Sequence, residues 1–166
     1  MELIEVDHED AVPSAFVLFL QTAQVVLKYA DSYLYRRTRL SVIKLIVLKI
    51  LASSSGDMAP SRIAELTNRG RNNITTLVGR MKRDGLVTAK RNSSNKRLVN
   101  INLTGKGREV LSQAMPVEKE IFNQVMLSIT EDDAELLKKK LTILRQNAQE
   151  GGEIWREKDT RCVHDS

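Results

Sequence analysis

Apolar residues recur at steps of three and four positions through the first part of the chain. The series consists of Phe16, Phe19, Leu20, Ala23, Val26, Leu27, Ala30 and Leu34. This spacing places all of them along one face of an α-helix, and the ring of Pro13 suits a first helical turn. The pattern therefore predicts one long amphipathic helix over residues 13–35.

The next part of the chain predicts three shorter helices. Their expected ranges are 42–52, 60–66 and 71–84. The first is apolar except for Lys44 and Lys49, so we expect it to be buried around most of its circumference, with Ser41 as its N-cap. The other two are separated by a polar turn, and Gly85 is placed to end the second.

The period of the pattern then changes to two. Apolar and polar residues alternate around Val87 and Ala89, and again around Ile101 and Leu103, as they do in half-buried strands. The polar stretch 91–96 between them is typical of a hairpin tip. We therefore expect a two-stranded β-ribbon.

The last third is again helical in pattern. Thr104 is expected to cap a long helix, and the run 130–133 resembles a capping box with Asp in place of Glu. A final helix carries Leu137, Leu141, Leu144 and Ala148 at heptad-like spacing, and Gly151-Gly152 is expected to end it. No apolar run reaches the roughly 18 residues of a membrane span, so none is predicted.

These elements predict a mainly α fold with a small β-wing, a winged helix-turn-helix flanked by long helices. The expected organisation is an acidic arm over 1–12, one domain over 13–150 and a loose tail over 151–166. Within the domain, 40–107 would form a DNA-binding lobe, and 13–35 and 108–150 would form dimerisation helices. A length of 166 residues with 42% hydrophobic and 28% charged composition is that of an ordinary globular domain.

Composition argues against several functions. The only cysteine is Cys162, which excludes an intrachain disulfide framework and suits a reducing cytoplasm. The two histidines, His8 and His164, lie in the terminal arms, where no rigid scaffold holds an imidazole for catalysis. We therefore expect neither an enzyme nor a bound metal or other cofactor, and Cys162 has no evident environment that would make it a redox sensor.

The positive charge is concentrated in one segment. Residues 61–110 hold 12 basic and 3 acidic side chains, a net of +9, whereas the whole chain has a formal charge of +5. The segments before and after carry −1 and −3, from 6 basic and 7 acidic and from 8 basic and 11 acidic side chains. A basic helix-turn-helix between mildly acidic ends is the electrostatic footprint of a protein that binds phosphate backbones.

The helix over 71–84 is polar on its outward face. An apolar face made of Ile74, Leu77, Val78 and Met81 would pack on the core. The opposite side holds Asn72, Thr76, Gly79, Arg80 and Arg83, with Asn73 and Thr75 at its flanks and no acidic residue. Asn and Arg can contact base edges in the major groove. The alternative is an ordinary solvated face, and Gly79 either allows a close approach of the backbone or is merely tolerated.

The hairpin tip provides a second set of cations. Lys90, Arg91, Lys96 and Arg97 stand in or beside it, placed to reach an adjacent minor groove. The alternative is a charged hairpin that faces solvent.

Together these residues resemble the MarR-type (multiple antibiotic resistance regulator) winged helix-turn-helix transcription factors. The matching stretches are Ile63-Ala64-Glu65-Leu66, Ile74-Thr75-Thr76-Leu77-Val78-Gly79-Arg80-Met81, Gly85-Leu86-Val87, Asn95-Lys96-Arg97 and Leu103-Thr104-Gly105-Lys106-Gly107. The resemblance implies a homodimer whose recognition helices enter successive major grooves of a pseudopalindromic operator. This sequence departs from the family pattern at two positions. In the wing, Asn95 replaces an Asp that helps hold Arg97, and Gly70 stands where the family has a Ser that caps the recognition helix.

The residues expected to contact double-stranded DNA are Arg71, Asn72, Asn73, Thr75, Thr76, Arg80, Arg83, Lys90, Arg91, Asn95, Lys96 and Arg97. Many relatives also respond to small aromatic ligands in a cleft beside the dimerisation helices. Tyr29, Tyr33, Tyr35 and Arg39 are candidates to line such a cleft. The alternative is that they are core and rim tyrosines beside a basic loop.

The favoured function is a dimeric repressor that binds DNA and is released by a small aromatic effector. The competing hypothesis is a winged-helix adaptor that binds an acidic protein without reading DNA sequence. The base-reading side chains Asn72, Asn73 and Thr76 favour the first.

Overall fold

The computed structural model describes residues 10–54, 58–91 and 99–164, with side chains except for Arg91 and residues beyond 152. The chain divides into two compact units, Met1–Val125 and Met126–Ser166. The expected single domain over 13–150 spans both, and each unit is described on its own below.

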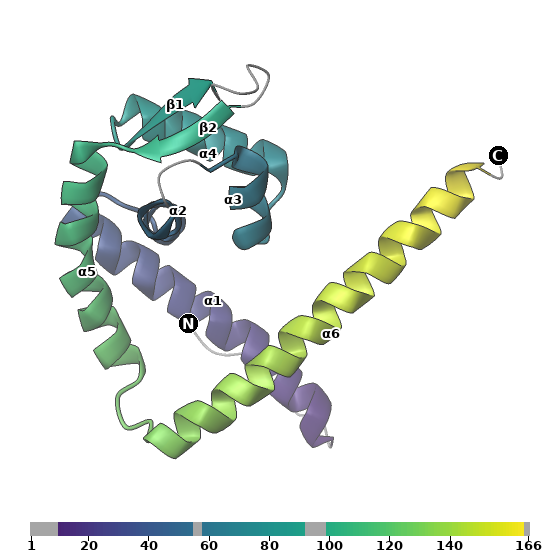
Figure 1. Cartoon of the computed structure of the whole chain (residues 1–166). Helices are drawn as coiled ribbons and strands as arrows, with labels where there is room; N and C mark the ends of the chain where they lie inside the picture. The colour runs from purple at the N-terminus through teal and green to yellow at the C-terminus, as the bar shows by residue number, and fades with distance from the viewer. Residues whose placement is uncertain (1–9, 55–57, 92–98, 165–166) are drawn as a thin grey trace. The chain divides into compact units, whose positions relative to one another are not determined.

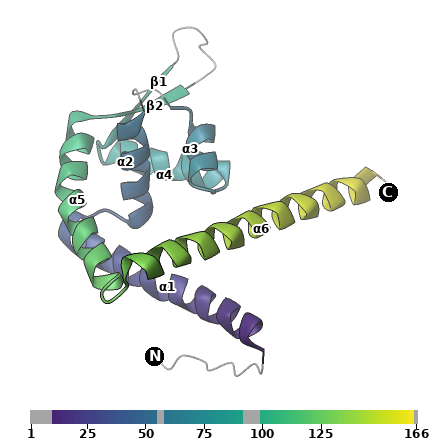
Figure 2. The same cartoon turned by 60° about the horizontal axis from the view of Figure 1, so that its bottom comes forward.

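The described chain is mainly helical, as the sequence predicted. The elements are α1 (Ala11–Thr38), α2 (Val42–Ser53), α3 (Pro60–Leu66), α4 (Arg71–Arg83), β1 (Val87–Arg91), β2 (Val99–Leu103), α5 (Gly105–Val125) and α6 (Glu131–His164) (Figure 1). The two strands pair antiparallel, with Val87 opposite Leu103 and Arg91 opposite Val99. In Figures 1 and 2 the strands lie beside α2, α3 and α4, while α1 contacts α5 near one end and diverges from it along its length. A winged helix-turn-helix with long flanking helices is therefore confirmed.

The core of the first unit forms where its elements meet. Leu34 of α1, Leu48 of α2, Ile63 of α3, Met81 of α4 and Ile101 of β2 are all essentially inaccessible to solvent. Burying five large apolar side chains from five elements provides much of the favourable free energy of folding. This shared core fixes α4 and the wing relative to the rest of the unit.

The predicted caps are present. The Ser41 hydroxyl accepts a hydrogen bond from the Lys44 amide over 3.4 Å at the start of α2. At α6 the Thr130 hydroxyl accepts from the Asp133 amide (3.2 Å), and the Asp133 carboxylate accepts from the Thr130 amide (3.3 Å). The Asp133 carboxylate also accepts from the Thr130 hydroxyl over 2.6 Å. This bond, together with the one from the Thr130 amide, holds the Asp133 pKa below its ordinary value, because both favour the ionised carboxylate. Gly85 has a φ of 75° and follows α4 as expected.

The bounds of two helices differ from the sequence-based expectation. Helix α1 begins two residues before Pro13 and continues to Thr38, where Arg39 turns the chain with a φ of 61°. Helix α6 does not end at Gly151-Gly152 but continues to His164, so the prediction that this glycine pair ends the last helix was wrong. Neither glycine adopts a positive φ, so the pair weakens the helix without supplying the left-handed residue that ends one.

The prediction that no segment is long and apolar enough for a membrane span was also wrong. Helix α1 contains an 18-residue window with a mean hydropathy of 1.4, which meets the requirement in length and composition. Core helices of soluble proteins meet the same requirement, so this is weak evidence for a span. Polar residues such as Gln21 and Thr22 interrupt the apolar residues of α1, so only the average over the window shows this property.

One strand-like contact was not predicted. The amide of Met58 donates to the Ile101 carbonyl over 3.3 Å, and the Ile101 amide donates back to Met58 over 2.8 Å. This bridge adds a short third member beside β2 and ties the chain before α3 to the wing.

Gly107 permits the closest backbone approach in the first unit. A β-carbon at this position would overlap the Leu86 carbonyl oxygen and crowd Leu103. We expect Gly107→Ala to lower the free energy of unfolding by about 1–3 kcal/mol, because rigid backbone has to move. Gly105→Ala is the matched control, since a β-carbon there meets nothing within 4 Å. Urea unfolding measures both, and equal stability of the two variants would contradict the packing described.

Candidate nucleic-acid interface

Helix α4 has one buried face and one exposed polar face. Ile74 and Met81 are 0% exposed and Val78 is 7% exposed, so this side is fixed in the core. The described residues of the opposite side are all exposed: Asn72, Thr76, Gly79, Arg80 and Arg83, together with Arg71, Asn73 and Thr75 at the flanks. The structure therefore places seven predicted contact residues, together with Gly79, at exposed positions of one helix.

The N-terminal turn of α4 is open to solvent. Gly70 is the N-cap residue and provides no side-chain cap for the first amides. Those amides and the positive end of the helix dipole favour an anion such as a phosphate. The hydroxyl of Thr75 donates to the Arg71 carbonyl over 2.9 Å, which orients the Thr75 methyl group. Both features suit a helix that approaches a nucleic acid with its first turns.

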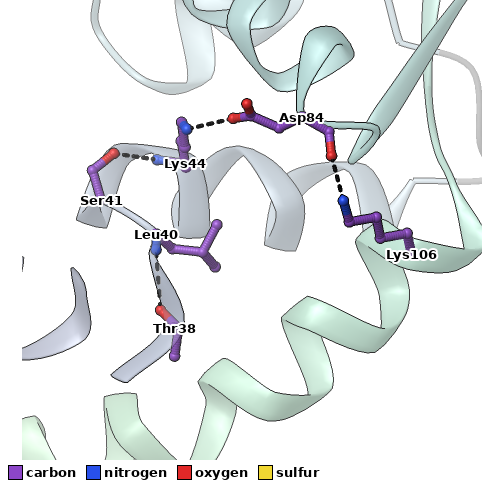
Figure 3. A network of polar contacts seen from close by, with 6 residues as sticks. All are labelled: Thr38, Leu40, Ser41, Lys44, Asp84 and Lys106. Carbon is purple, nitrogen blue, oxygen red and sulfur yellow. Dashed lines mark hydrogen bonds and ion pairs between the residues drawn. The ribbon is translucent and has the colours of Figure 1, made fainter. Parts of the chain in front are cut away.

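A polar network holds the other end of α4 (Figure 3). The Lys44 ammonium of α2 lies 2.7 Å from the Asp84 carboxylate, and the Lys106 ammonium of α5 donates to the Asp84 carbonyl over 2.8 Å. Leu40 and Ser41 extend the network toward the end of α1, where the Leu40 amide donates to the Thr38 hydroxyl. Asp84 thus joins α4 to two other helices and fixes the direction in which its outward face points.

The base of the wing is anchored by Thr104. Its hydroxyl donates to the Gly85 carbonyl over 2.7 Å and accepts from the Gly107 amide over 2.9 Å. Lys90 is exposed on β1. The Arg91 backbone pairs with Val99, but its side chain and the other predicted wing contacts, Asn95, Lys96 and Arg97, lie outside the described residues.

The predicted ligand-cleft residues form a brace between α1 and α5. The Tyr33 hydroxyl donates to the Glu120 carboxylate over 2.7 Å, and Arg37 donates to the Tyr33 oxygen over 3.0 Å. The Tyr29 ring centre lies 5.8 Å from that of Tyr33. The hydrogen bond to Glu120 raises the Tyr33 pKa above its ordinary value of 10.0, with burial adding to the effect and the Arg37 charge opposing it.

The other two cleft candidates pair with each other. The Arg39 guanidinium lies over the Tyr35 ring, 5.5 Å from its centre. Tyr35 is exposed.

A pocket of about 460 Å³ lies between α1, α2 and the end of α3. Its lining residues are Leu27, Lys28, Asp31, Val42, Ile43, Ile46, Leu66, Thr67 and Arg69. The four cleft candidates are not among them. Sequence reasoning missed this pocket because its walls come from three elements whose packing no local pattern reveals. Among the described residues, no group of three or more His, Cys, Asp or Glu side chains is arranged to hold a metal ion.

The buried inner face of α4, its polar outer face and the two-stranded wing define a winged helix-turn-helix protein. The structure is similar to that of Sco3205, a MarR family transcriptional regulator from Streptomyces coelicolor, solved in complex with DNA. That likeness has a TM-score of 0.77 at 20% identity and covers 86% of this chain and 92% of Sco3205. The fold is therefore that of the MarR-family transcriptional regulators, as the sequence resemblance indicated.

Two further relatives are regulators. The organohalide-sensing regulator RdhR-CbdbA1625, solved with 2,4-dichlorophenol bound, has a TM-score of 0.76 at 24% identity, covering 89% of each chain. The transcriptional repressor YetL of Bacillus subtilis is 25% identical over 96 residues. That match spans 58% of this chain and 58% of YetL, somewhat more than half of either. No family model matches the chain.

The Tyr33 brace predicts a tyrosine titration that depends on Glu120. Because the raised pKa reflects a phenol that donates to a carboxylate, the bond is fully present below the ordinary tyrosine pKa and is lost as the pH rises through the raised one. We expect Glu120→Gln to move the pKa of one of the three tyrosines down toward its ordinary value, as measured by ultraviolet absorbance. Glu118→Gln is the control, because Glu118 pairs with Lys49. Identical titrations of both variants and the unmodified protein would argue against the brace.

Proposed function

We propose that the protein is a sequence-specific, double-stranded DNA-binding transcriptional regulator of the cytoplasm, acting as a dimeric repressor on a pseudopalindromic operator. The observation that carries the proposal is the outward face of α4. The core holds Ile74 and Met81 on one side, which leaves Asn72, Thr76 and Arg83 directed away from the protein. Asparagine and arginine make bidentate contacts with adenine and guanine edges, and the threonine methyl group contacts thymine.

The charge around this face supports a nucleic-acid partner. The net of +9 over residues 61–110 comes from the segment that contains α3, α4 and the wing. Helix α4 itself has three basic residues in its last turn and no acidic one in its first. Cations in this arrangement neutralise phosphates and release counterions, which gives affinity before any base is read.

A dimer is supported by the apolar surface of the two terminal helices. Along α1 the exposed large apolar side chains include Phe16, Leu18 and Leu27, and along α6 they include Leu136 and Ile143. Exposed apolar surface of this kind marks an interface, and a two-fold pair would bury the same surface of each copy. Two recognition helices would then read two half-sites about one helical turn apart.

The first test is DNA binding by the full chain. We expect it to enrich a consensus duplex from a random pool and to bind it with two chains per duplex, as measured by sedimentation. Asn72→Ala should lose about 1–3 kcal/mol of binding free energy at particular bases. Arg83→Ala should lower the salt slope of binding by about one.

Arg145→Ala is the control for Arg83→Ala, because Arg145 is also an exposed arginine but belongs to α6. It should bind the duplex as the unmodified protein does. Failure to enrich any sequence would contradict the proposal and favour the adaptor hypothesis. Unchanged binding by both α4 variants would show that other residues make the contacts.

We also propose that a small aromatic effector releases the protein from DNA by binding in the pocket between α1, α2 and α3. Its volume of about 460 Å³ suits a small molecule. The lining combines apolar side chains such as Ile43 and Ile46 with two cations, Lys28 and Arg69, and one carboxylate, Asp31. Such a lining favours an aromatic ring that carries a weakly acidic hydroxyl, which can donate to a carboxylate and, when ionised, pair with a cation. RdhR-CbdbA1625, which has a similar fold, binds 2,4-dichlorophenol. The lining does not include Tyr29, Tyr33, Tyr35 or Arg39, so the contact of these residues with an effector stays a separate prediction of the sequence.

The effector is tested with 2,4-dichlorophenol as the probe. We expect it to bind the chain in calorimetry and to weaken the complex with the enriched duplex. Ile46→Trp should abolish both effects by filling the pocket, whereas Val25→Trp, at a similarly exposed α1 position outside the lining, should not. Binding that survives Ile46→Trp would place the ligand elsewhere.

A further inference from the structure

Gly79 interrupts the outward ridge of α4. Residues 72, 76, 79 and 83 follow one another at steps of four, three and four, so they form one line along the helix. Asn72, Thr76 and Arg83 are exposed polar side chains on that line, and Gly79 stands between the last two. The ridge therefore has a notch where a side chain is missing.

Among the residues that the structure describes, none requires a glycine at this position. A β-carbon on Gly79 would meet nothing within 4 Å, and its φ is not in the left-handed region. Gly107 and Gly85 differ, because the first avoids a clash with the Leu86 carbonyl and the second has a φ of 75°. A glycine inside a helix is less favourable than alanine, because it loses more conformational freedom on folding. The free protein thus gains no packing from this glycine.

We propose that Gly79 is a specificity-determining position that lets the backbone of α4 enter the major groove closely between Thr76 and Arg83. The inference rests on the proposed DNA-binding function and adds to it the depth at which the helix binds. With no side chain at 79, the helix surface lies closer to the base edges, and the neighbouring short Thr76 reaches bases that a continuous ridge would hold away. Specific complexes require this depth, whereas loose binding to phosphates does not.

The test compares Gly79→Ala and Gly79→Leu, since both replacements favour a helix and differ in size. We expect Gly79→Ala to raise Tm by about 2–4 °C in the free protein. The same variant should bind the enriched duplex about tenfold more weakly or worse, with a larger loss for Leu. Affinity for a random duplex of equal length should change by less than about twofold.

Gly151→Ala is the matched control, because Gly151 is another helical glycine with nothing within 4 Å of its β-carbon and belongs to α6. It should alter Tm in the same direction and leave DNA binding unchanged. Wild-type affinity of Gly79→Ala for the enriched duplex would overturn the inference, and so would a lower Tm. If the unmodified protein enriches no duplex at all, the proposed function itself fails, which is a distinguishable result.

Discussion

The burial of one face of α4 is the constraint on which the proposed interface depends. Ile74 and Met81 are completely inaccessible to solvent, so the helix cannot rotate about its axis without exposing large apolar side chains. Each such side chain contributes about 1.5–3 kcal/mol when buried. Successive residues of a helix are rotated by 100°, so the burial of Ile74 and Met81 also directs the opposite face away from the protein. That face holds Asn72, Thr76 and Arg83. The polar face needs no further interaction to orient it.

Rotation about the axis is only part of the position of α4, and the polar contacts at its C-terminal end supply the rest. The Lys44–Asp84 ion pair and the bond from Lys106 to the Asp84 carbonyl connect this end to α2 and α5. Thr104 connects the turn at Gly85 with the start of α5. Two residues after that start, Gly107 lies so close to the Leu86 carbonyl that only a glycine fits. The end of α4, the wing and α5 therefore meet at a closely packed junction.

Most of the secondary structure could be predicted from local patterns. The inner face of α4, the two strands and the Ser41, Thr104 and Thr130 caps depend on residues close together in the sequence, where spacing is informative. The continuation of α6 through Gly151-Gly152 was missed because glycine lowers helix propensity without defining a backbone angle. The outward face of α4 was predictable for the same local reason as its inner face.

Interactions between distant segments could not be predicted from residue spacing. The pocket draws its walls from α1, α2 and the end of α3, and the Tyr33–Glu120 bond joins residues 87 positions apart. No spacing rule places such residues together, because their proximity is decided by how whole helices pack. Tyrosine spacing on α1 therefore identified a real cluster, but its partners lie on α5 instead of in the described pocket.

The start of α2 joins the pocket to the proposed DNA-binding face. Asp31 lines the pocket and its carboxylate accepts a hydrogen bond from the Val42 amide over 2.6 Å. Lys44, two residues further along α2, pairs with Asp84 at the end of α4. A ligand that engaged Asp31 would compete with that amide and disturb the first turn of α2. Since an effector acts only through contacts that differ between two conformations, these few residues form a physical connection by which it would alter the direction of α4.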